Sequence, residues 1–133
     1  MRRWIPYFNK GGLMADDNCI FCKIAAGTIP SKKVYEDEGF YAFHDIHPAA
    51  PVHVLVIPRK HIETLSACTH DDTGLIGKMM LLIPRIAAQL GVDYTGGETG
   101  YRTIFNVGPG GGQEVYHLHA HILAGPRPWT RMG

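Results

Sequence analysis

The chain has 133 residues, of which 45% are hydrophobic and 19% are charged, a composition typical of one globular domain. Lys and Arg together number 13 against 12 Asp and Glu, so the net charge of +1 excludes the strongly basic surface that binds nucleic acid or an anionic membrane. No stretch approaches the ~18 consecutive apolar residues of a membrane-spanning helix.

The first 15 residues show neither helical nor strand periodicity and include Gly11-Gly12. We therefore expect a flexible leader over residues 1–15 and a folded domain over residues 16–133. The residues after Arg3 lack the apolar core of a secretory signal, and an odd number of cysteines does not suit a disulfide framework. A reducing, cytoplasmic location is the expectation that follows.

A short apolar run over residues 19–26 ends at Gly27 and predicts a brief helix, because glycine readily adopts the positive φ that stops a helix. Three segments rich in Val, Ile, Tyr and Phe follow, separated by turn residues. They predict strands over residues 33–36, 40–45 and 52–57. The links between these strands are too short for parallel crossovers, so antiparallel pairing is expected.

Apolar residues then recur at spacings of three and four over residues 75–90, which predicts the main helix. Thr69, followed three residues later by Asp72, resembles a capping box before that helix. Two further strands are predicted over residues 102–107 and 116–124. The expected fold class is therefore α+β: a five-stranded antiparallel sheet, a short N-terminal helix, and one long helix covering one face.

Three histidines, His117, His119 and His121, stand at alternate positions of the last predicted strand. Successive side chains of a strand point to opposite faces, so the three imidazoles share one face while Leu118 and Ala120 face the core. An imidazole, with an ordinary pKa of about 6.5, can act as nucleophile, acid, base or metal ligand near neutrality. A solvated polar face is the other interpretation, and three histidines so closely spaced on an apolar strand make it the less favoured one.

A glycine-rich segment, residues 106–116, immediately precedes the histidines. Glycines have no Cβ, so their backbone N–H groups can approach an anion closely, and the segment is a candidate phosphate cradle. Taken alone, the segment is more simply a hairpin loop. Its position beside three aligned imidazoles favours the phosphate cradle.

The segment His117-Leu118-His119-Ala120-His121-Ile122-Leu123 resembles the motif of the histidine triad (HIT) family, in which three histidines alternate with apolar residues. The resemblance extends to residues 19–24, 43–46, 51–61 and 111–117, and within the family the chain is most similar to the Hint branch, the purine nucleoside phosphoramidases. It implies a HIT-like fold and a homodimer in which two five-stranded sheets join into one of ten strands.

The resemblance implies catalytic roles for four histidines. His119 would attack the α-phosphorus of a nucleotide and form a nucleotidyl-histidine that water hydrolyses. The backbone carbonyl of His117 would hold one ring nitrogen of His119 as N–H, which frees the other nitrogen to attack. His121 would contact the phosphate oxygens, and His53 would orient the triad.

The resemblance also implies a nucleoside subsite. Asp45 matches the carboxylate that accepts hydrogen bonds from both ribose hydroxyls. The apolar walls around the purine would be formed by Ile20, Phe21, Ile24, Phe43 and Ile46. Without the resemblance, ordinary core packing would be the preferred interpretation of these five residues.

Three residues, Asn106, Gly112 and Gln113, match the phosphate-side loop of the family. Glu114 departs from the animal members, in which a serine at this position contacts the leaving group. A carboxylate changes the charge that the leaving amine meets, so the departure bears on the choice of leaving group. The tail, residues 126–133, is expected to approach the partner subunit's site and to shape selectivity.

A zinc site is a separate expectation. Cys19 and Cys22 form a Cys-x-x-Cys pair, which supplies two zinc ligands from one turn. Some branches of the superfamily bind zinc through such a pair together with histidines that match His61 and His117. The alternative is a pair of reduced cysteines without metal. The implied catalysis itself requires no cofactor.

The favoured function is therefore hydrolysis of the P–N bond of purine nucleoside 5′-phosphoramidates, releasing AMP or GMP, and also hydrolysis of acyl-adenylates. Two alternatives stay open. One is a nucleotide-binding regulatory or scaffold protein with incidental hydrolysis, and the other is a dinucleoside polyphosphate hydrolase as in the Fhit branch. The run of residues 111–116 favours the Hint branch.

Overall fold

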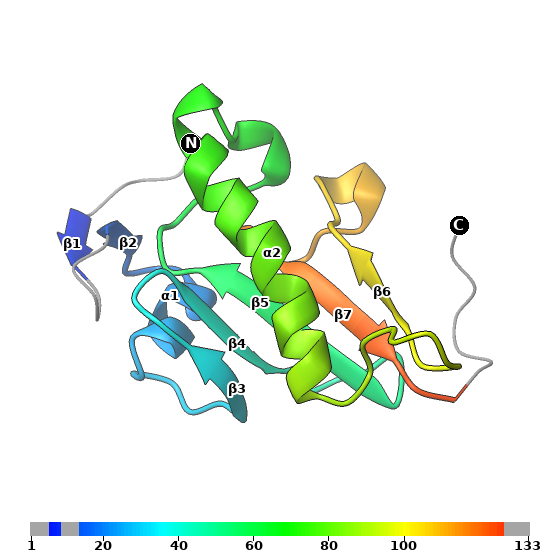
Figure 1. Cartoon of the computed structure of the whole chain (residues 1–133). Helices are drawn as coiled ribbons and strands as arrows, with labels where there is room; N and C mark the ends of the chain where they lie inside the picture. Colours follow the sequence, from blue (N-terminus) through cyan, green and yellow to red (C-terminus); the bar gives the residue numbers. More distant parts are fainter. Residues whose placement is uncertain (1–5, 9–13, 127–133) are drawn as a thin grey trace.

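The computed structural model describes residues 6–8 and 14–126 and is built around one five-stranded sheet (Figure 1). The strands lie in the order β3-β4-β5-β7-β6 and every neighbouring pair is antiparallel, so the predicted sheet is confirmed. They are β3 (Lys33–Glu36), β4 (Phe40–His44), β5 (Val52–Pro58), β6 (Tyr101–Ile104) and β7 (Ala120–Ala124). The bounds of β3 agree with the prediction, and β6 ends three residues earlier than expected.

The long helix α2 (Thr73–Gln89) crosses one face of the sheet (Figure 1). The predicted capping box of Thr69 and Asp72 is present, but it caps the 3-10 turn η2 (His70–Asp72), which leads into α2. The apolar residues at helical spacing pack against the sheet in a core that includes Met79, Leu82, Ile86, Val54, Val56, Leu118, Ala120 and Ile122. This core confirms the apolar face predicted for the helix.

The opposite face of the sheet carries the short helix α1 (Ile20–Ala25). Cys19 caps its N-terminus, because the Cys19 Sγ accepts a hydrogen bond from the Cys22 N–H at 3.4 Å. A helix of six residues is too short to be stable alone, so its contacts with the sheet must hold it. A second core does so, and its members include Phe21, Cys22, Ile24, Tyr41, Phe43, Leu55 and Ile57.

Strand β7 is shorter than predicted, since it begins at Ala120 rather than at residue 116. Continuing the register between β5 and β7 would place Pro58 opposite Leu118, and proline has no backbone N–H to extend the ladder. The Leu118 N–H bonds outside the strand pair instead. His117 and His119 therefore lie in irregular backbone before β7, although Leu118 still faces the α2 core as the predicted alternation requires.

Residues 1–15 were expected to form a flexible leader, and short strands are found in this part of the chain. A small antiparallel sheet pairs β1 (Pro6–Phe8) with β2 (Met14–Asp16), and each strand is too short to show a periodic pattern of side chains.

Two further 3-10 turns are η1 (Leu65–Ala67) and η3 (Pro109–Gly111). In the described part of the chain no helix is long and apolar enough to span a membrane. The predicted selectivity tail lies, beyond residue 126, outside the described residues.

Candidate active site

The ring of His119, the middle histidine of the triad, is fixed by one short hydrogen bond. Its Nδ1 lies 2.7 Å from the backbone carbonyl oxygen of His117, which can only accept, so the proton is on Nδ1. The lone pair is then on Nε2, a neutral and nucleophilic nitrogen. The side chain is buried, and the ring of Phe21 packs edge-on against it with 5.1 Å between centroids.

A chain of hydrogen bonds fixes the third histidine, His121. The Ala49 N–H donates to His53 Nδ1 at 3.0 Å, which places the proton of His53 on Nε2. His53 Nε2 lies 2.8 Å from His121 Nδ1 and donates to it. The proton of His121 is therefore on Nε2, and the Asn106 side-chain amide, 3.4 Å away, can accept it through its oxygen, because a flip of the amide exchanges oxygen and nitrogen. Such an N–H suits a phosphate oxygen.

Burial keeps these histidines neutral near pH 7. Removal from water lowers the pKa of His53 and of His119, and it lowers the pKa of His121 to about 4. The carboxylate of Asp45 opposes the shift, since its Oδ2 lies 3.5 Å from His53 Nε2, but burial outweighs it. The His119 lone pair is consequently available for attack at neutral pH.

Asp45, His53 and His121 also offer three potential metal-ligand atoms within 4.8 Å of one another. The hydrogen bonds do not suit a metal, because a metal on His53 Nε2 would require the proton on Nδ1, where the Ala49 N–H already donates. The 2.8 Å separation of the two nitrogens is also shorter than the roughly 3.3 Å between two nitrogens on one tetrahedral zinc. His53 and His121 form a hydrogen-bonded pair, and the Asp45 carboxylate lies beside it.

A separate buried cluster contains the four predicted zinc ligands, Cys19, Cys22, His61 and His117. His117 Nδ1 lies 3.3 Å from Cys19 Sγ, 3.5 Å from Cys22 Sγ and 3.3 Å from His61 Nδ1. Ligand atoms on a tetrahedral zinc are separated by about 3.3–3.8 Å, so the spacing fits that metal.

The protonation states in this cluster also suit a metal. His117 Nε2 donates to the Pro58 carbonyl at 2.7 Å, which leaves Nδ1 unprotonated and facing the cysteines. A hydrogen bond from the Cys22 thiol lowers the pKa of Cys19 and favours the thiolate, the form that binds metal. The structure thus brings the Cys-x-x-Cys pair together with the two histidines that the family resemblance implied.

The five residues expected around the purine divide into a buried and an exposed set. Phe21, Ile24 and Phe43 are buried, and the rings of Phe21 and Phe43 pack edge to face with 5.4 Å between centroids. Ile20 and Ile46 are 48% and 83% exposed. Core packing therefore accounts for Ile24 and Phe43, whereas Ile20 and Ile46 keep apolar surface open to a ligand.

The glycine-rich segment folds into η3, and Gly112 follows it with a φ of 81° that favours glycine. Gln113 was expected on the phosphate side, but its side chain is buried within the segment. Its Oε1 accepts the Gly108 N–H at 3.0 Å, and its Nε2 donates to two backbone carbonyls at 2.8 and 3.0 Å. Gln113 thus fixes the shape of the segment, and the side chain of Glu114 next to it is exposed.

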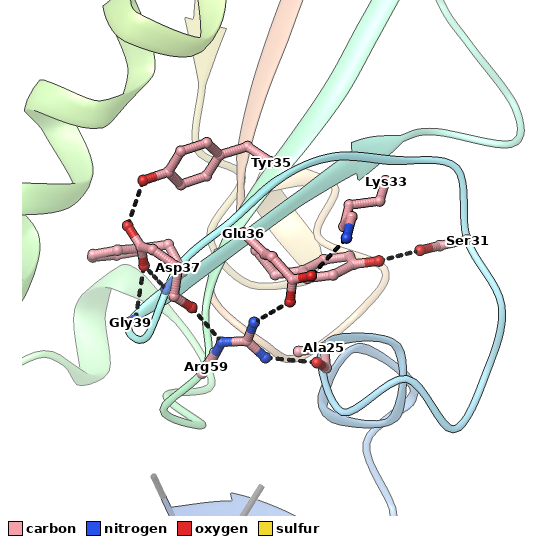
Figure 2. A network of polar contacts seen from close by, with 10 residues as sticks. Ala25, Ser31, Lys33, Tyr35, Glu36, Asp37, Gly39 and Arg59 are labelled. Carbon is pink, nitrogen blue, oxygen red and sulfur yellow. Dashed lines mark hydrogen bonds and ion pairs between the residues drawn. The ribbon is translucent and has the colours of Figure 1, made fainter. Parts of the chain in front are cut away.

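Sequence reasoning missed Arg59, which directly follows β5 and is only 1% exposed. Its guanidinium donates hydrogen bonds to Ala25, Glu36 and Asp37, as Figure 2 shows. The signal that could have found it is a cation placed directly after a strand of buried apolar residues, since a buried charge requires dedicated partners.

Comparisons with known proteins agree with this geometry. The profile of the HIT domain family matches residues 26–127. Protein HitA of Neisseria gonorrhoeae is 50% identical over 110 residues, which cover 83% of this chain and 98% of that protein. A histidine triad protein from Clostridium difficile is 45% identical with a TM-score of 0.81, covering 90% of this chain and 100% of that one. A HIT family hydrolase from Legionella pneumophila Philadelphia 1 is 47% identical with a TM-score of 0.77, covering 83% and 95%.

Proposed function

Since the chain belongs to the HIT domain family, we propose that it hydrolyses the P–N bond of purine nucleoside 5′-phosphoramidates and also cleaves acyl-adenylates, releasing AMP or GMP. The observation that carries the proposal is the 2.7 Å hydrogen bond from His119 Nδ1 to the His117 carbonyl, which presents an unprotonated Nε2. The similarity to a HIT family hydrolase, 47% identical to this chain, supports the reaction class.

The reaction proceeds in two displacements at phosphorus. His119 Nε2 attacks the α-phosphorus, the P–N bond breaks, and the amine leaves after taking up a proton from solvent. His121 donates its Nε2–H to a phosphate oxygen and stabilises the charge that develops there. Water then attacks the phosphorus of the nucleotidyl-histidine, the bond to His119 breaks, and the nucleoside monophosphate is released. Neither step changes an oxidation state, so the proposed reaction requires no redox cofactor.

The nucleoside would lie between β4 and α1. Asp45 accepts the His47 N–H on Oδ1 at 2.8 Å, and each of its carboxylate oxygens has a further lone pair for a ribose hydroxyl. The purine would cover the exposed side chains of Ile20 and Ile46. The exposed carboxylate of Glu114 favours a cationic leaving amine over an anionic one.

We also propose zinc as the metal of the Cys19, Cys22, His61 and His117 cluster, on the basis of the ligand spacing and protonation described above. When bound, zinc supplies a structural cross-link between α1 and the segment before β7. Only the ring of His117 faces the cluster, so its backbone carbonyl remains the acceptor for His119.

The proposal includes a homodimer in a reducing compartment, the cytoplasm, where Cys19 and Cys22 remain thiols. Within the described residues, β6 is an edge strand that pairs only with β7. A second copy would pair with that edge. Light scattering coupled to size-exclusion chromatography measures the mass, and a monomer at micromolar concentration would contradict this part of the proposal.

The decisive experiment measures AMP release from adenosine 5′-phosphoramidate by wild type, His119→Ala and His70→Ala. His70 is an exposed histidine of η2 and serves as the matched control. We expect wild type and His70→Ala to turn over alike, and His119→Ala to lose about 10³-fold or more. Acid quenching followed by mass spectrometry should detect a nucleotidyl adduct on wild type and none on His119→Ala.

Two outcomes would overturn the proposed reaction, and a third would overturn the proposed nucleophile. AMP binding without turnover would favour the nucleotide-binding regulatory protein. Faster cleavage of diadenosine polyphosphate than of phosphoramidate would favour the dinucleoside polyphosphate hydrolase. Turnover that persists in His119→Ala would move the nucleophile to another residue.

A further inference from the structure

Helix α1 carries Phe21 against the nucleophile His119, yet it is too short to hold its own position. Its N-terminal end is held by Cys19 and Cys22, which belong to the cysteine and histidine cluster. Its C-terminal end is held by Arg59, a residue outside that cluster.

Arg59 joins three parts of the fold through one planar group (Figure 2). Nη1 donates to the carbonyl of Ala25, the last residue of α1, at 2.6 Å. Nε donates to the Asp37 carbonyl in the turn after β3 at 2.7 Å, and Nη2 donates to Glu36 Oε1 at 2.9 Å. A cation at the C-terminal end of a helix also interacts favourably with the helix dipole. The guanidinium carbon lies 5.7 Å from the centre of the Tyr41 ring, whose face it covers.

The backbone at Arg59 strengthens this arrangement. The Arg59 N–H donates to the Gly39 carbonyl at 2.8 Å, so backbone and side chain both contact the turn between β3 and β4. The preceding carbonyl, of Pro58, accepts the ring proton of His117 at 2.7 Å. Two consecutive residues therefore fix the position of α1 and the ring of a triad histidine.

We propose that Arg59 is a positioning residue of the nucleoside subsite: by holding the C-terminal end of α1 against the turn between β3 and β4, it keeps Ile20 and Phe21 in place beside His119. The inference rests on the proposed function for the identity of the ligand. Arg59 acts through α1 and has no contact with substrate. A purely structural role would lower the unfolding temperature but leave nucleotide affinity unchanged in the folded protein.

The test compares Arg59→Met with the matched control Lys33→Met. Lys33 belongs to the same network, since it pairs with Glu36 at 2.6 Å, but its side chain is half exposed and this pair lies within β3. AMP affinity is measured by calorimetry well below the unfolding temperature of each protein. Amide hydrogen exchange is measured in the peptide over residues 16–28 and, for comparison, in α2.

We expect Arg59→Met to bind AMP about tenfold more weakly than wild type. Relative to wild type, its amide exchange should be faster over residues 16–28, with a smaller change in α2. Lys33→Met should match wild type in both measurements. AMP affinity within twofold of wild type in folded Arg59→Met would overturn the inference, whether or not exchange changes over residues 16–28.

A second variant and the exchange measurement keep a misfolded variant, a failed inference and a failed proposed function distinguishable. If Arg59→Met fails to fold, Arg59→Lys replaces it. One ammonium group cannot make the forked set of hydrogen bonds to Ala25, Glu36 and Asp37, so the same effects should follow at smaller size. If wild type itself does not bind AMP, the proposed function fails, and the exchange measurement still decides whether Arg59 holds α1.

Discussion

The two faces of the central sheet are built from alternate residues of the same strands, yet they differ in kind. On the α2 face, Val54 and Ile122 pack in an apolar core beneath Met79. On the α1 face, buried polar groups such as His53 and His119 lie among the apolar side chains, and each has a specific hydrogen-bond partner. One strand pair thus supports an apolar core on one side and a hydrogen-bonded site on the other.

The difference shows how stability and chemistry are separated in so small a domain. Apolar contacts are non-directional, so the α2 core can tolerate exchange of one aliphatic side chain for another of similar volume. The α1 face depends on proton positions and on partners at set distances, and the loss of one partner leaves a buried polar group unsatisfied. We expect changes on the α2 face to alter stability, and changes on the α1 face to alter metal binding, pH response and turnover.

Removal of metal is expected to have the largest effect on stability, and it acts only on the α1 face. Zinc added to metal-free protein should stabilise it by about 4 kcal/mol at a free concentration 1,000 times its Kd. Cys22→Ser should lose most of this gain, whereas Cys68→Ser, outside the cluster, should keep it. Thermal unfolding with and without chelator, together with elemental analysis, measures the effect. Absence of stoichiometric zinc would contradict the zinc proposal.

Truncation of Met79, a residue of α2 that is fully buried against the sheet, alters only the apolar face. Met79→Ala should cost about 2–5 kcal/mol of unfolding free energy, because it leaves a cavity in a packed core. Turnover per folded molecule should remain that of wild type. Its neighbour Met80 is 47% exposed, so Met80→Ala should stay within about 0.5 kcal/mol in the same urea titration. Equal costs for the two variants would refute the core assigned to α2.

Acid should weaken the α1 face selectively through His121, which faces His53, His119 and Asp45. Burial lowers the pKa of His121 to about 4, below the unfolded value of about 6.5. Between these pH values the unfolded chain binds a proton that the native state does not, so stability falls as the pH falls through this window and is constant above it. His121→Gln should show a shallower decline of unfolding temperature from pH 6.5 to 4.

The control for this experiment is His70→Gln, an exposed histidine distant from the site in the sequence. Its decline should parallel that of wild type over the same pH range. A decline as steep in His121→Gln as in wild type would show that His121 is not the group that links protonation to unfolding.

The smallest effect is expected at the ion pair between Lys60, just after β5, and Asp72 in η2, whose Nζ and Oδ1 atoms lie 2.9 Å apart. The Lys60 side chain is 45% exposed, so solvent screens the pair. Lys60→Met should leave the unfolding temperature and AMP affinity unchanged within error. A loss of stability comparable to that of Met79→Ala would show that this ion pair contributes as much to stability as the apolar core under α2.

Local pattern was sufficient to predict most of the elements. The run of β-branched and apolar residues in β5, the alternation in β7, the helical spacing in α2 and the capping pair of Thr69 and Asp72 all depend on residues a few positions apart. Such signals follow from the period of a strand or helix, so one sequence carries them in full. The triad was predicted for the same reason, because its three histidines are two residues apart.

Other features depend on contacts between distant segments, and the tertiary structure alone decided them. Cys19 and His117 are 98 positions apart, and only the resemblance to a family suggested that they meet. Pro58 ends the ladder with β7 because the register places it there, and Gln113 is turned inward because backbone carbonyls lie within its reach. Arg59 gave no periodic signal, since its acceptors lie on two distant segments, the end of α1 at Ala25 and the end of β3 at Glu36 and Asp37, that only packing brings together.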